Sequence, residues 1–208
     1  ASCLVGSEMC IRDRLNDDTL LEQTQFTQTG PDTGRRLSHL DPGNQPPLAV
    51  IDQCILLALC LNIHNTQPSH GLTSEQMSAF VERVIQHPLN WSVHTMSLLL
   101  RSRLEASRTR TVERSTLQLQ ALIDQMPTND SSVRERLRFF HALELPAKWA
   151  MQSELAHRYV SIGVLRSALE TFERVEMWEN VVQCLGLLGR QQEGIEVVRD
   201  LLEGRKTE

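Results

Sequence analysis

Histidine side chains, the commonest general bases and frequent metal ligands, are scattered through this sequence. His70, His87, His94, His141 and His157 form no HExxH string and no pair four residues apart. Zinc and metallohydrolase sites on helices depend on such spacing. We therefore expect these rings to make surface or interhelical hydrogen bonds, and we predict no metal site.

The nucleophilic residue types also lack a catalytic pattern. Five cysteines form no CxxC pair, and no serine lies in a nucleophile elbow or beside a glycine-rich phosphate loop. Cys54, Cys60 and Cys184 fall on apolar faces, which predicts core thiols. The sequence thus predicts no catalytic residue, no cofactor and no small-molecule substrate, so the protein is not expected to be an enzyme. The odd cysteine number favours the reducing cytoplasm.

One group of charged residues has the chemistry to bind a ligand. Five arginines and two glutamates lie between residues 101 and 114, a net +3 in a chain of net charge -5. Because arginine pairs bidentately with carboxylates and phosphates, the group predicts a docking site for an acidic or phosphorylated protein segment. The alternative is a solvated corner between two helices, with charges that complement the helix dipoles. The candidate docking residues are Arg101, Arg103, Arg108, Arg110 and Arg114.

The composition limits the class of protein that positions these residues. Hydrophobic residues make up 40% of the 208 and charged residues 23%, which is typical of a globular chain. The acidic balance argues against nucleic-acid binding. The most apolar run, Cys54 to Ile63, is ten residues, about half of the ~20 residues of a membrane span, so no membrane insertion is expected. An aromatic content of 4% favours stacked helices over a β-sandwich.

The first residues give no fold signal. Leu4 to Arg14 resembles one translated frame of a transposase library-preparation oligonucleotide. A signal peptide is the alternative, but Glu8 interrupts its apolar stretch and no basic start precedes it. We expect residues 1–14 to be a non-native adapter-derived tail and the chain to be a fragment. Residues 15–46, rich in Gly, Pro, Thr and Gln, are expected to be mostly a disordered linker.

From Pro47 the chain predicts short helices, which form an N-terminal helical region over residues 47–145. Pro47 suits the first turn of a helix that runs to about Asn62. The apolar spacing predicts that its buried face consists of Leu48, Ile51, Ile55, Leu59 and Ile63.

Polar residues predict where the following helices start. Thr73 with Gln76 resembles a capping box, and Asn90 suits the N-cap of the next helix. Asn129 or Asp130 is expected to cap a short helix that ends before Pro146. No window alternates with period two for long enough to predict a strand.

Residues 146–208 contain a spacing that occurs twice, 26 residues apart. Each copy has small residues where two helices approach, larger residues that fill the gap, and a glycine at the turn. Two copies are fewer than the ~3 usually needed for a stable stack, so the array is expected to continue beyond Glu208. The predicted packing residues are Ala156, Tyr159, Gly163, Ala168 and Phe172, followed by Val182, Leu185, Gly189, Gly194 and Val198.

This spacing resembles the tetratricopeptide repeat, and several strings resemble one family, that of tetratricopeptide repeat protein 27. The matching strings include His70-Gly71-Leu72-Thr73, Leu100 to Glu105, Leu145 to Ala150 and Phe172 to Val182. The last contains Glu176-Met177-Trp178-Glu179, which repeat packing does not dictate. The resemblance extends from Pro47 to Glu208 and implies a truncated all-α helix-hairpin array, a tetratricopeptide-like α-solenoid.

The resemblance also implies a function. The family is regarded as a non-catalytic protein-interaction scaffold, and relatives are connected with chaperone-assisted assembly of large complexes. Repeat arrays that grip the acidic C-terminus of heat-shock chaperones place Lys and Asn four residues apart on a first helix. Ser153 and His157 occupy the matching positions here, so these pairs do not resemble that clamp. Two alternatives remain open: a non-catalytic part of a larger enzyme, and a purely structural packing module.

Overall fold

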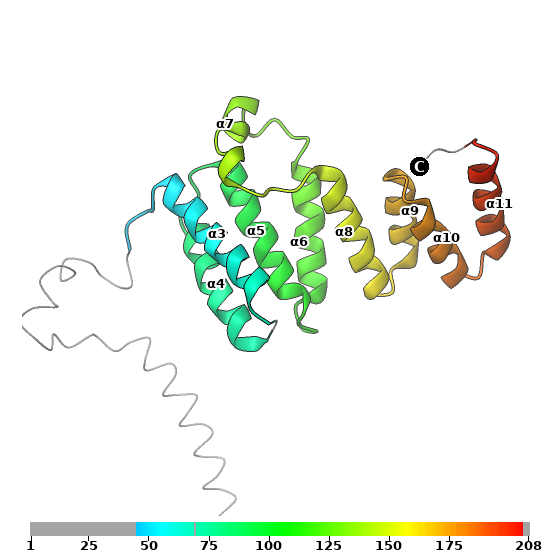
Figure 1. Cartoon of the computed structure of the whole chain (residues 1–208), viewed down its shortest axis with the longest axis horizontal. Coiled ribbons are helices and arrows are strands. Elements are labelled where there is room, and N and C mark those ends of the chain that lie inside the picture. The colour runs from blue at the N-terminus through cyan, green and yellow to red at the C-terminus, as the bar shows by residue number, and fades with distance from the viewer. Residues whose placement is uncertain (1–44, 69, 206–208) are drawn as a thin grey trace, which may run out of the picture. The chain divides into compact units, whose positions relative to one another are not determined.

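The computed structural model describes residues 45–68 and 70–205. The predicted adapter tail at residues 1–14 and nearly all of the predicted linker at residues 15–46 lie outside the described residues. Helices and loops make up the described part, which contains no strand, so the all-α fold class is confirmed (Figure 1). The helices are α3 (Val50–Thr66), α4 (Gly71–Ile85), α5 (Trp91–Ala106), α6 (Val112–Gln125), α7 (Val133–Leu137), α8 (Lys148–Ser161), α9 (Leu165–Arg174), α10 (Trp178–Leu187) and α11 (Gln191–Leu202), with a 3₁₀ turn, η1 (Phe140–Ala142).

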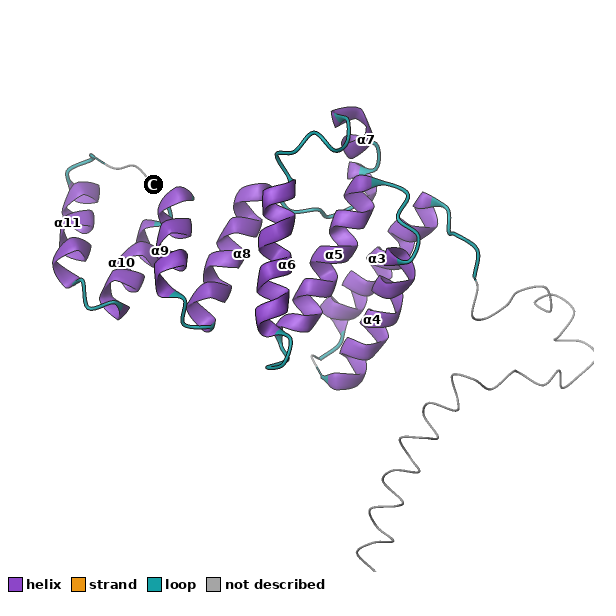
Figure 2. Ribbon diagram, turned by 180° about the vertical axis from the view of Figure 1, so that it is seen from behind, coloured by secondary structure: helices purple, strands orange, loops and turns teal. Residues whose placement is uncertain are grey.

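Each long helix packs against the next one along the chain. The contacts run from α3 to α4, α5 and α6, pass to α8, and continue through α9 and α10 to α11. Figure 2 shows this row from behind, with the loops joining α8 to α11 at alternating ends of the helices. Helix α7 contacts α5 and lies outside the row, within the connection between α6 and α8. Sequential packing of this kind is the architecture of a helical repeat array.

Two groups of buried side chains stabilise the row. The larger joins α3, α4, α5, α6 and the first half of α8, and the smaller joins α8, α9 and α10. Tyr159 of α8 packs against both groups. Fully buried members of the larger group include Leu57, Val81, Met96, Leu99, Leu119 and Met151, and those of the smaller include Ala156, Ala168, Phe172 and Val181.

The prediction for the first helix is wrong about its start and its buried face. The helix begins at Val50, so Pro47 precedes it. Ile51, Ile55 and Leu59 are 63%, 51% and 45% exposed. The helix is apolar on nearly every side, so the spacing of its apolar residues does not indicate which side packs. The side that packs against α4 and α5 consists of Gln53, Cys54, Leu57, Cys60 and Ile63.

The cap at Asn90 is confirmed. Its Oδ1 accepts hydrogen bonds from the backbone N–H groups of Ser92, at 3.1 Å, and Val93, at 3.3 Å. These two groups lack partners within the helix, so the amide side chain satisfies them.

Two other cap predictions are wrong. His70, not Thr73, is the N-cap of α4, and Thr73 is a buried residue whose Oγ1 donates to the Pro68 carbonyl at 3.1 Å. The short helix α7 is capped by Ser132, which accepts from the Glu135 N–H at 3.3 Å, and not by Asn129 or Asp130. Several polar residues precede each of these two helices, so the sequence alone did not single out the residue that becomes the cap.

The helices α8 to α11 end in one type of turn. After α8, Val164 N–H donates to the Tyr159 carbonyl at 2.8 Å and Gly163 N–H donates to the Val160 carbonyl at 3.0 Å. This pair of bonds is a Schellman motif, which requires a left-handed residue after the helix. Gly163 supplies it with φ 82°, and Gly189 does so after α10 with φ 75°.

The same motif closes α9 with a residue that is not glycine. Met177 N–H donates to the Phe172 carbonyl at 3.0 Å, and Glu176 has φ 62°. Glu176 lies 13 residues after Gly163 and 13 before Gly189, so the structural period is half of the 26-residue spacing in the sequence.

Candidate protein-interaction site

Three of the five candidate arginines line one hollow. Arg101 lies near the end of α5, Arg108 in the turn that follows, and Arg114 in the first turn of α6. Together with the start of α4 they enclose a cavity of about 230 Å³. We call this feature the arginine hollow. Ser74, Ser78 and Glu82 of α4 line its opposite wall. The Ser74 and Ser78 hydroxyls donate to the backbone carbonyls of His70 and Ser74.

One carboxylate pairs with two of these arginines. Glu105 Oε1 lies 3.0 Å from Arg101 Nε and 2.9 Å from Arg114 Nη2, and its Oε2 accepts from Arg114 Nε at 3.1 Å. The Glu105 side chain is 15% exposed, whereas those of Arg101 and Arg114 are 40% and 57% exposed. Each guanidinium carries five N–H donors, so one carboxylate leaves most of them available for a ligand.

Arg108 adds an exposed positive charge to the hollow. Among the described residues its side chain has no ion pair and no hydrogen bond. The turn that carries it is nevertheless fixed, because Thr111 N–H donates to the Arg108 carbonyl at 3.0 Å and Thr111 Oγ1 donates to the Glu105 carbonyl at 2.7 Å. These two hydrogen bonds fix the backbone of the turn from which the Arg108 side chain extends.

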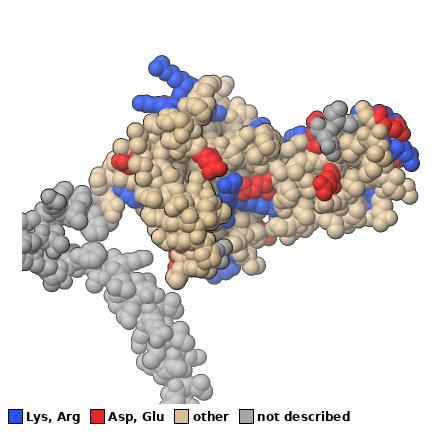
Figure 3. Space-filling view, in the orientation of Figure 1, with Lys and Arg blue, Asp and Glu red and all other residues tan. Residues whose placement is uncertain are grey.

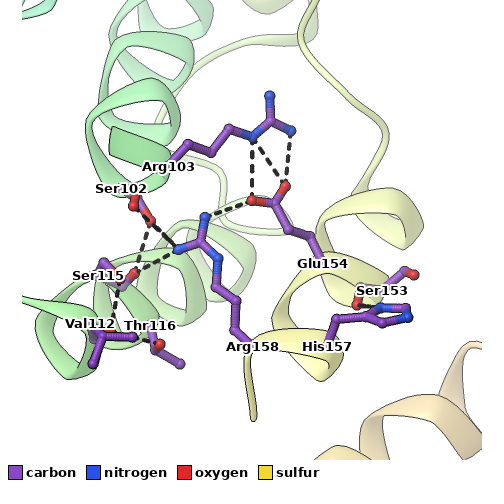
Figure 4. A network of polar contacts seen from close by, with 9 residues as sticks. All are labelled: Ser102, Arg103, Val112, Ser115, Thr116, Ser153, Glu154, His157 and Arg158. Carbon is purple, nitrogen blue, oxygen red and sulfur yellow. Dashed lines mark hydrogen bonds and ion pairs between the residues drawn. The ribbon is translucent and has the colours of Figure 1, made fainter. Parts of the chain in front are cut away.

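The other two candidates lie elsewhere. Arg110 is exposed in the same turn but does not line the hollow. Arg103 extends to α8, where its Nε and Nη2 reach the carboxylate of Glu154 at 3.2 and 2.9 Å (Figure 4). The structure therefore divides the predicted group of five into a hollow of three, one exposed residue and one interhelical ion pair.

Glu154 belongs to a polar network that the sequence analysis missed. Arg158 Nη2 donates to Glu154 Oε1 at 2.6 Å, and its Nη1 donates to Ser102 Oγ at 2.7 Å. Ser102 Oγ in turn donates to the Ser115 carbonyl at 2.8 Å, so α5, α6 and α8 are joined (Figure 4). The four-residue spacing of Glu154 and Arg158 was the available sequence signal for half of this network.

The network changes the acidity of its carboxylate. Burial by itself raises the pKa of Glu154, but the hydrogen bond and charge of Arg103, with the charge and hydrogen bond of Arg158, outweigh this effect. The pKa of Glu154 therefore lies below its ordinary value. An ionised, doubly paired carboxylate at this position stabilises the packing of α8 against α5.

The described residues contain no group of three or more His, Cys, Asp or Glu side chains arranged to hold a metal ion. Cys54, Cys60 and Cys184 are buried free thiols, as predicted from their apolar faces. Burial raises the pKa of Cys60 to about 11, so this sulfur is a poor nucleophile. No described helix is long and apolar enough to cross a membrane.

Comparison with known proteins identifies relatives of this array. The chain is 40% identical over 226 aligned residues to a TPR repeat-containing protein of Schizosaccharomyces pombe, a match that covers 91% of this chain and 28% of that protein. It is 39% identical to the tetratricopeptide repeat protein 27 homolog of Dictyostelium discoideum, over 74% of this chain and 18% of the relative. The chain belongs to the tetratricopeptide repeat protein 27 family.

A third relative extends the comparison. The Saccharomyces cerevisiae protein named "Essential for maintenance of the cell wall protein 1" is 30% identical over 78% of this chain and 19% of that protein. The chain thus spans between 18% and 28% of the length of these three relatives. It matches no family model and no solved structure.

The aligned segment covers more of the chain than the strings that suggested the family. Residues 47–208 are 162 of the 208, less than the 91% of the chain that aligns with the S. pombe protein. The similarity therefore extends into the segment before Pro47, and the prediction that it fails there is wrong. The strings that carried the prediction all lie after Pro47, and the segment before Pro47 has little helical periodicity to reveal a relationship.

In the two tetratricopeptide-like pairs, α8 with α9 and α10 with α11, the predicted packing residues fall into four environments. Most lie inside the array or at its turns. Val198 is 41% exposed, although the spacing places it at the position of the buried Phe172. The buried residues are Ala156, Ala168, Phe172, Leu185 and Gly194, the half-buried ones are Tyr159 and Val182, and the turn residues are Gly163 and Gly189.

Ser153 and His157 occupy the positions that bind the chaperone C-terminus in clamp-type repeats. Here His157 makes contacts within the array. His157 Nδ1 lies 2.8 Å from the Ser153 carbonyl oxygen (Figure 4). The His157 ring meets Phe172 edge to face, with 5.1 Å between ring centroids. This histidine therefore packs α8 against α9.

Proposed function

We propose that this chain is a non-catalytic protein-interaction scaffold whose arginine hollow docks an acidic or phosphorylated segment of a partner protein. The observation that carries the proposal is the exposed guanidinium of Arg108, without a carboxylate partner among the described residues, beside two arginines that share Glu105. Carboxylate and phosphate groups match the paired N–H geometry of arginine. The relatives, which are tetratricopeptide repeat proteins, support the scaffold role.

A solvated helix corner is the competing explanation for the same arginines. Such a corner needs a positive charge only near the last turn of α5. In such a corner the ion pairs with Glu105 bring Arg101 and Arg114 together, but no carboxylate holds Arg108 on the same hollow. The position of Arg108 therefore favours docking.

The test uses two matched substitutions in one turn. Arg108→Ala and Arg110→Ala each remove one exposed arginine, but only Arg108 lines the hollow. The probe is a fluorescent peptide that carries two phosphoserines among Asp and Glu residues. We expect Arg108→Ala to weaken its binding about tenfold, roughly one charge-assisted pair, and Arg110→Ala to change it little. Equal effects of the two substitutions, or no binding to the unchanged chain, would contradict docking at the hollow.

Glu105→Gln supplies a second, opposite test. The substitution removes the carboxylate that Arg101 and Arg114 share, so both guanidiniums become available to the probe peptide. We expect tighter peptide binding, together with lower thermal stability, because the two ion pairs are lost. Unchanged affinity would show that these arginines do not contact the ligand.

The wider cellular role is also a proposal. Chaperone-linked assembly of larger complexes, in the cytoplasm, agrees with the scaffold role and with the exposed arginines. Because His157 contacts the Ser153 carbonyl and packs against Phe172, a chaperone would bind a different surface. Co-purification of the full-length protein with chaperones, compared with its Arg108→Ala variant, tests the link.

The alternative is that the chain is a non-catalytic part of a larger enzyme. The relatives are several times longer than the matched segment, which spans 18% to 28% of their length. Turnover of a substrate panel by the full-length protein would support this alternative. Inactive panels and a metal-free protein would remove it.

A further inference from the structure

The short helix α7 exposes its apolar residues to solvent, whereas an ordinary surface helix buries them. None of its residues is buried. Its apolar residues Val133 and Leu137, with Phe140 just beyond its end, are 70%, 57% and 69% exposed. We call these three side chains the apolar α7 face. Val133 and Leu137 lie four residues apart, on one side of α7, and Phe140 follows in the 3₁₀ turn η1. A surface helix normally turns its apolar side toward the core.

Polar side chains hold α7 against the start of α5. Asn90 Nδ2 donates to the Glu135 carboxylate at 2.6 Å and to the Glu135 carbonyl at 3.1 Å. Ser92 Oγ donates to the Arg136 carbonyl at 2.6 Å. These bonds fix the inner side of the helix, so the outward direction of its apolar side is set by the fold.

Arg136 completes this inner side. Its guanidinium lies 4.0 Å from the centre of the Trp91 ring. It also donates to the Met126 carbonyl at 2.6 Å and to the Thr128 carbonyl. One arginine thus anchors the connection from α6 as well as α7 itself. The anchored helix presents its apolar residues without needing them for its own packing.

Positive charge borders the apolar α7 face. Arg134 and Arg138 are exposed, and neither forms an ion pair within residues 45–68 and 70–205. Basic side chains protrude over α7 in the space-filling view, and no acidic side chain lies beside them there (Figure 3). Residues 132–141 contain three arginines and one glutamate in a chain of net charge -5. The patch is therefore complementary to an acidic surface.

We propose that the apolar α7 face, with Arg134 and Arg138, is a second docking site that binds an acidic amphipathic segment of a partner protein. Apolar side chains of the segment cover Val133, Leu137 and Phe140, and its carboxylates pair with the two arginines. Arginine and aromatic residues are the types that dominate interface energies. The site is separate from the arginine hollow, which lies at the opposite end of α5.

An acidic protein segment fits this site better than an anionic membrane does. A membrane surface attracts basic segments by about 1 kcal/mol per Lys or Arg, and stable attachment uses clusters of four or more. Two arginines without an ion pair, of which Arg138 also lies over the Phe139 ring at 5.4 Å, do not reach that number. Three apolar side chains on so short a helix also bury little surface in lipid.

The experiment selects binding peptides from a random library, so the identity of the partner protein need not be known. A phage-displayed library of random 16-residue peptides is selected on the full chain and counter-selected on the Leu137→Asp/Phe140→Asp variant. Circular dichroism and thermal melting confirm that each variant folds. Leu187→Asp, at a leucine of α10 that is 64% exposed, and Arg110→Glu are the matched controls for apolar loss and charge reversal.

We expect the selected peptides to combine Asp or Glu with Leu, Phe or Trp at helical spacing. They should bind at least tenfold more weakly to Leu137→Asp/Phe140→Asp and to Arg134→Glu/Arg138→Glu, and equally well to both controls. Lysine versions of the same peptides should prefer the charge-reversed variant. This exchange of preference is the result that identifies direct pairing with the two arginines.

Other results would overturn the proposal. They are the absence of enriched peptides, enrichment of basic peptides, and binding that the α7 variants leave unchanged. If only Arg108→Ala abolished binding, the selected peptides would bind the arginine hollow and not the apolar α7 face. That result would support the proposed function and contradict the second site. A concentration-dependent dimer abolished by Leu137→Asp/Phe140→Asp would make a second copy the occupant. If the chain floated with phosphatidylserine vesicles and the Leu137→Asp/Phe140→Asp variant did not, the occupant of the apolar α7 face would be a membrane.

Discussion

Glu176 adopts a backbone conformation that favours glycine, at a turn whose counterparts are Gly163 and Gly189. Its φ is 62°, and its side chain is exposed. A residue with a Cβ costs roughly 1 kcal/mol in this region.

We expect Glu176→Gly to raise the free energy of unfolding by about 0.5–1 kcal/mol, because the left-handed strain is relieved. Urea denaturation measures the change. Glu179→Gly is the control, since Glu179 lies in the first turn of α10, where glycine should lower stability. A loss of stability in Glu176→Gly would mean that its side chain makes a stabilising interaction.

His94 makes stability depend on pH. Burial lowers the pKa of this ring below 6.5 in the folded chain, and its Nδ1 has no hydrogen-bond partner within the described structure. The unfolded state therefore binds the proton more readily, so stability falls as the pH drops below about 6.5 toward the lowered folded value. Thermal melts from pH 8 to pH 5 should show this loss, and it should be smaller in His94→Gln. A matched change at exposed His141, His141→Gln, should keep the wild-type profile, and identical profiles for all three chains would reject the assignment.

At the scale of the element, α3 shows how an apolar helix chooses its buried side. Leu57 is 1% exposed and Leu59, two residues further on, is 45% exposed. We expect Leu57→Ala to cost about 2–4 kcal/mol through the cavity it leaves, and Leu59→Ala to cost under about 1 kcal/mol. Chemical denaturation of the two variants measures the difference. Similar losses would mean that the outer side of α3 is covered in solution.

The attachment of α8 to α5 and α6 depends on Arg158. Its side chain is 10% exposed and bonds Glu154 and Ser102 at once. We expect Arg158→Met to lower stability by about 2–3 kcal/mol, since the buried Ser102 and the half-buried Glu154 both lose a charged donor. Arg158→Lys should recover only part of this loss because a single ammonium cannot reproduce the forked contacts.

A double-mutant cycle separates this interaction from packing. Glu154→Gln combined with Arg158→Met should cost less than the sum of the single changes, because the two side chains share one network. Additive losses would show that the network does not couple them. The Glu154 contribution should also be present above about pH 4.5 and disappear as the pH falls through its lowered folded pKa.

At the scale of residues 47–205, α8 links the two buried groups. Met151 belongs to the larger group and Ala156 to the smaller, while Tyr159 packs against both and donates to Gln120 Oε1 at 2.6 Å. In a repeat array, stability is shared between neighbours through such interfaces. The two groups should therefore unfold together.

Tyr159→Ala tests this coupling. In the unchanged chain, hydrogen exchange followed by mass spectrometry should report one unfolding free energy for α5 and α10. In the variant we expect α10 to exchange at a lower denaturant concentration than α5, since the shared contact is lost. Tyr159→Phe, which keeps the ring, should retain the single transition. Separate transitions already present in the unchanged chain would contradict the coupling.

The sequence by itself determined that the part of the chain after Pro47 is helical and how two of its repeat turns, at Gly163 and Gly189, close. Asn90, Gly163 and Gly189 act through bonds to backbone groups within a few residues, so their effect is readable from neighbouring letters. The family strings lie on the same local elements. The all-α fold class and the family followed from these signals.

Only the tertiary structure decided which sides of the helices face one another. An apolar helix such as α3 fits several ways, and its buried side depends on residues of α4 and α5. The grouping of the arginines depended on Glu105 and on Glu154, which approaches from a helix about fifty residues later. The outward apolar face of α7 depended on polar anchors from α5. Long-range contacts of this kind have no spacing in the sequence, because they arise from the packing of separate elements.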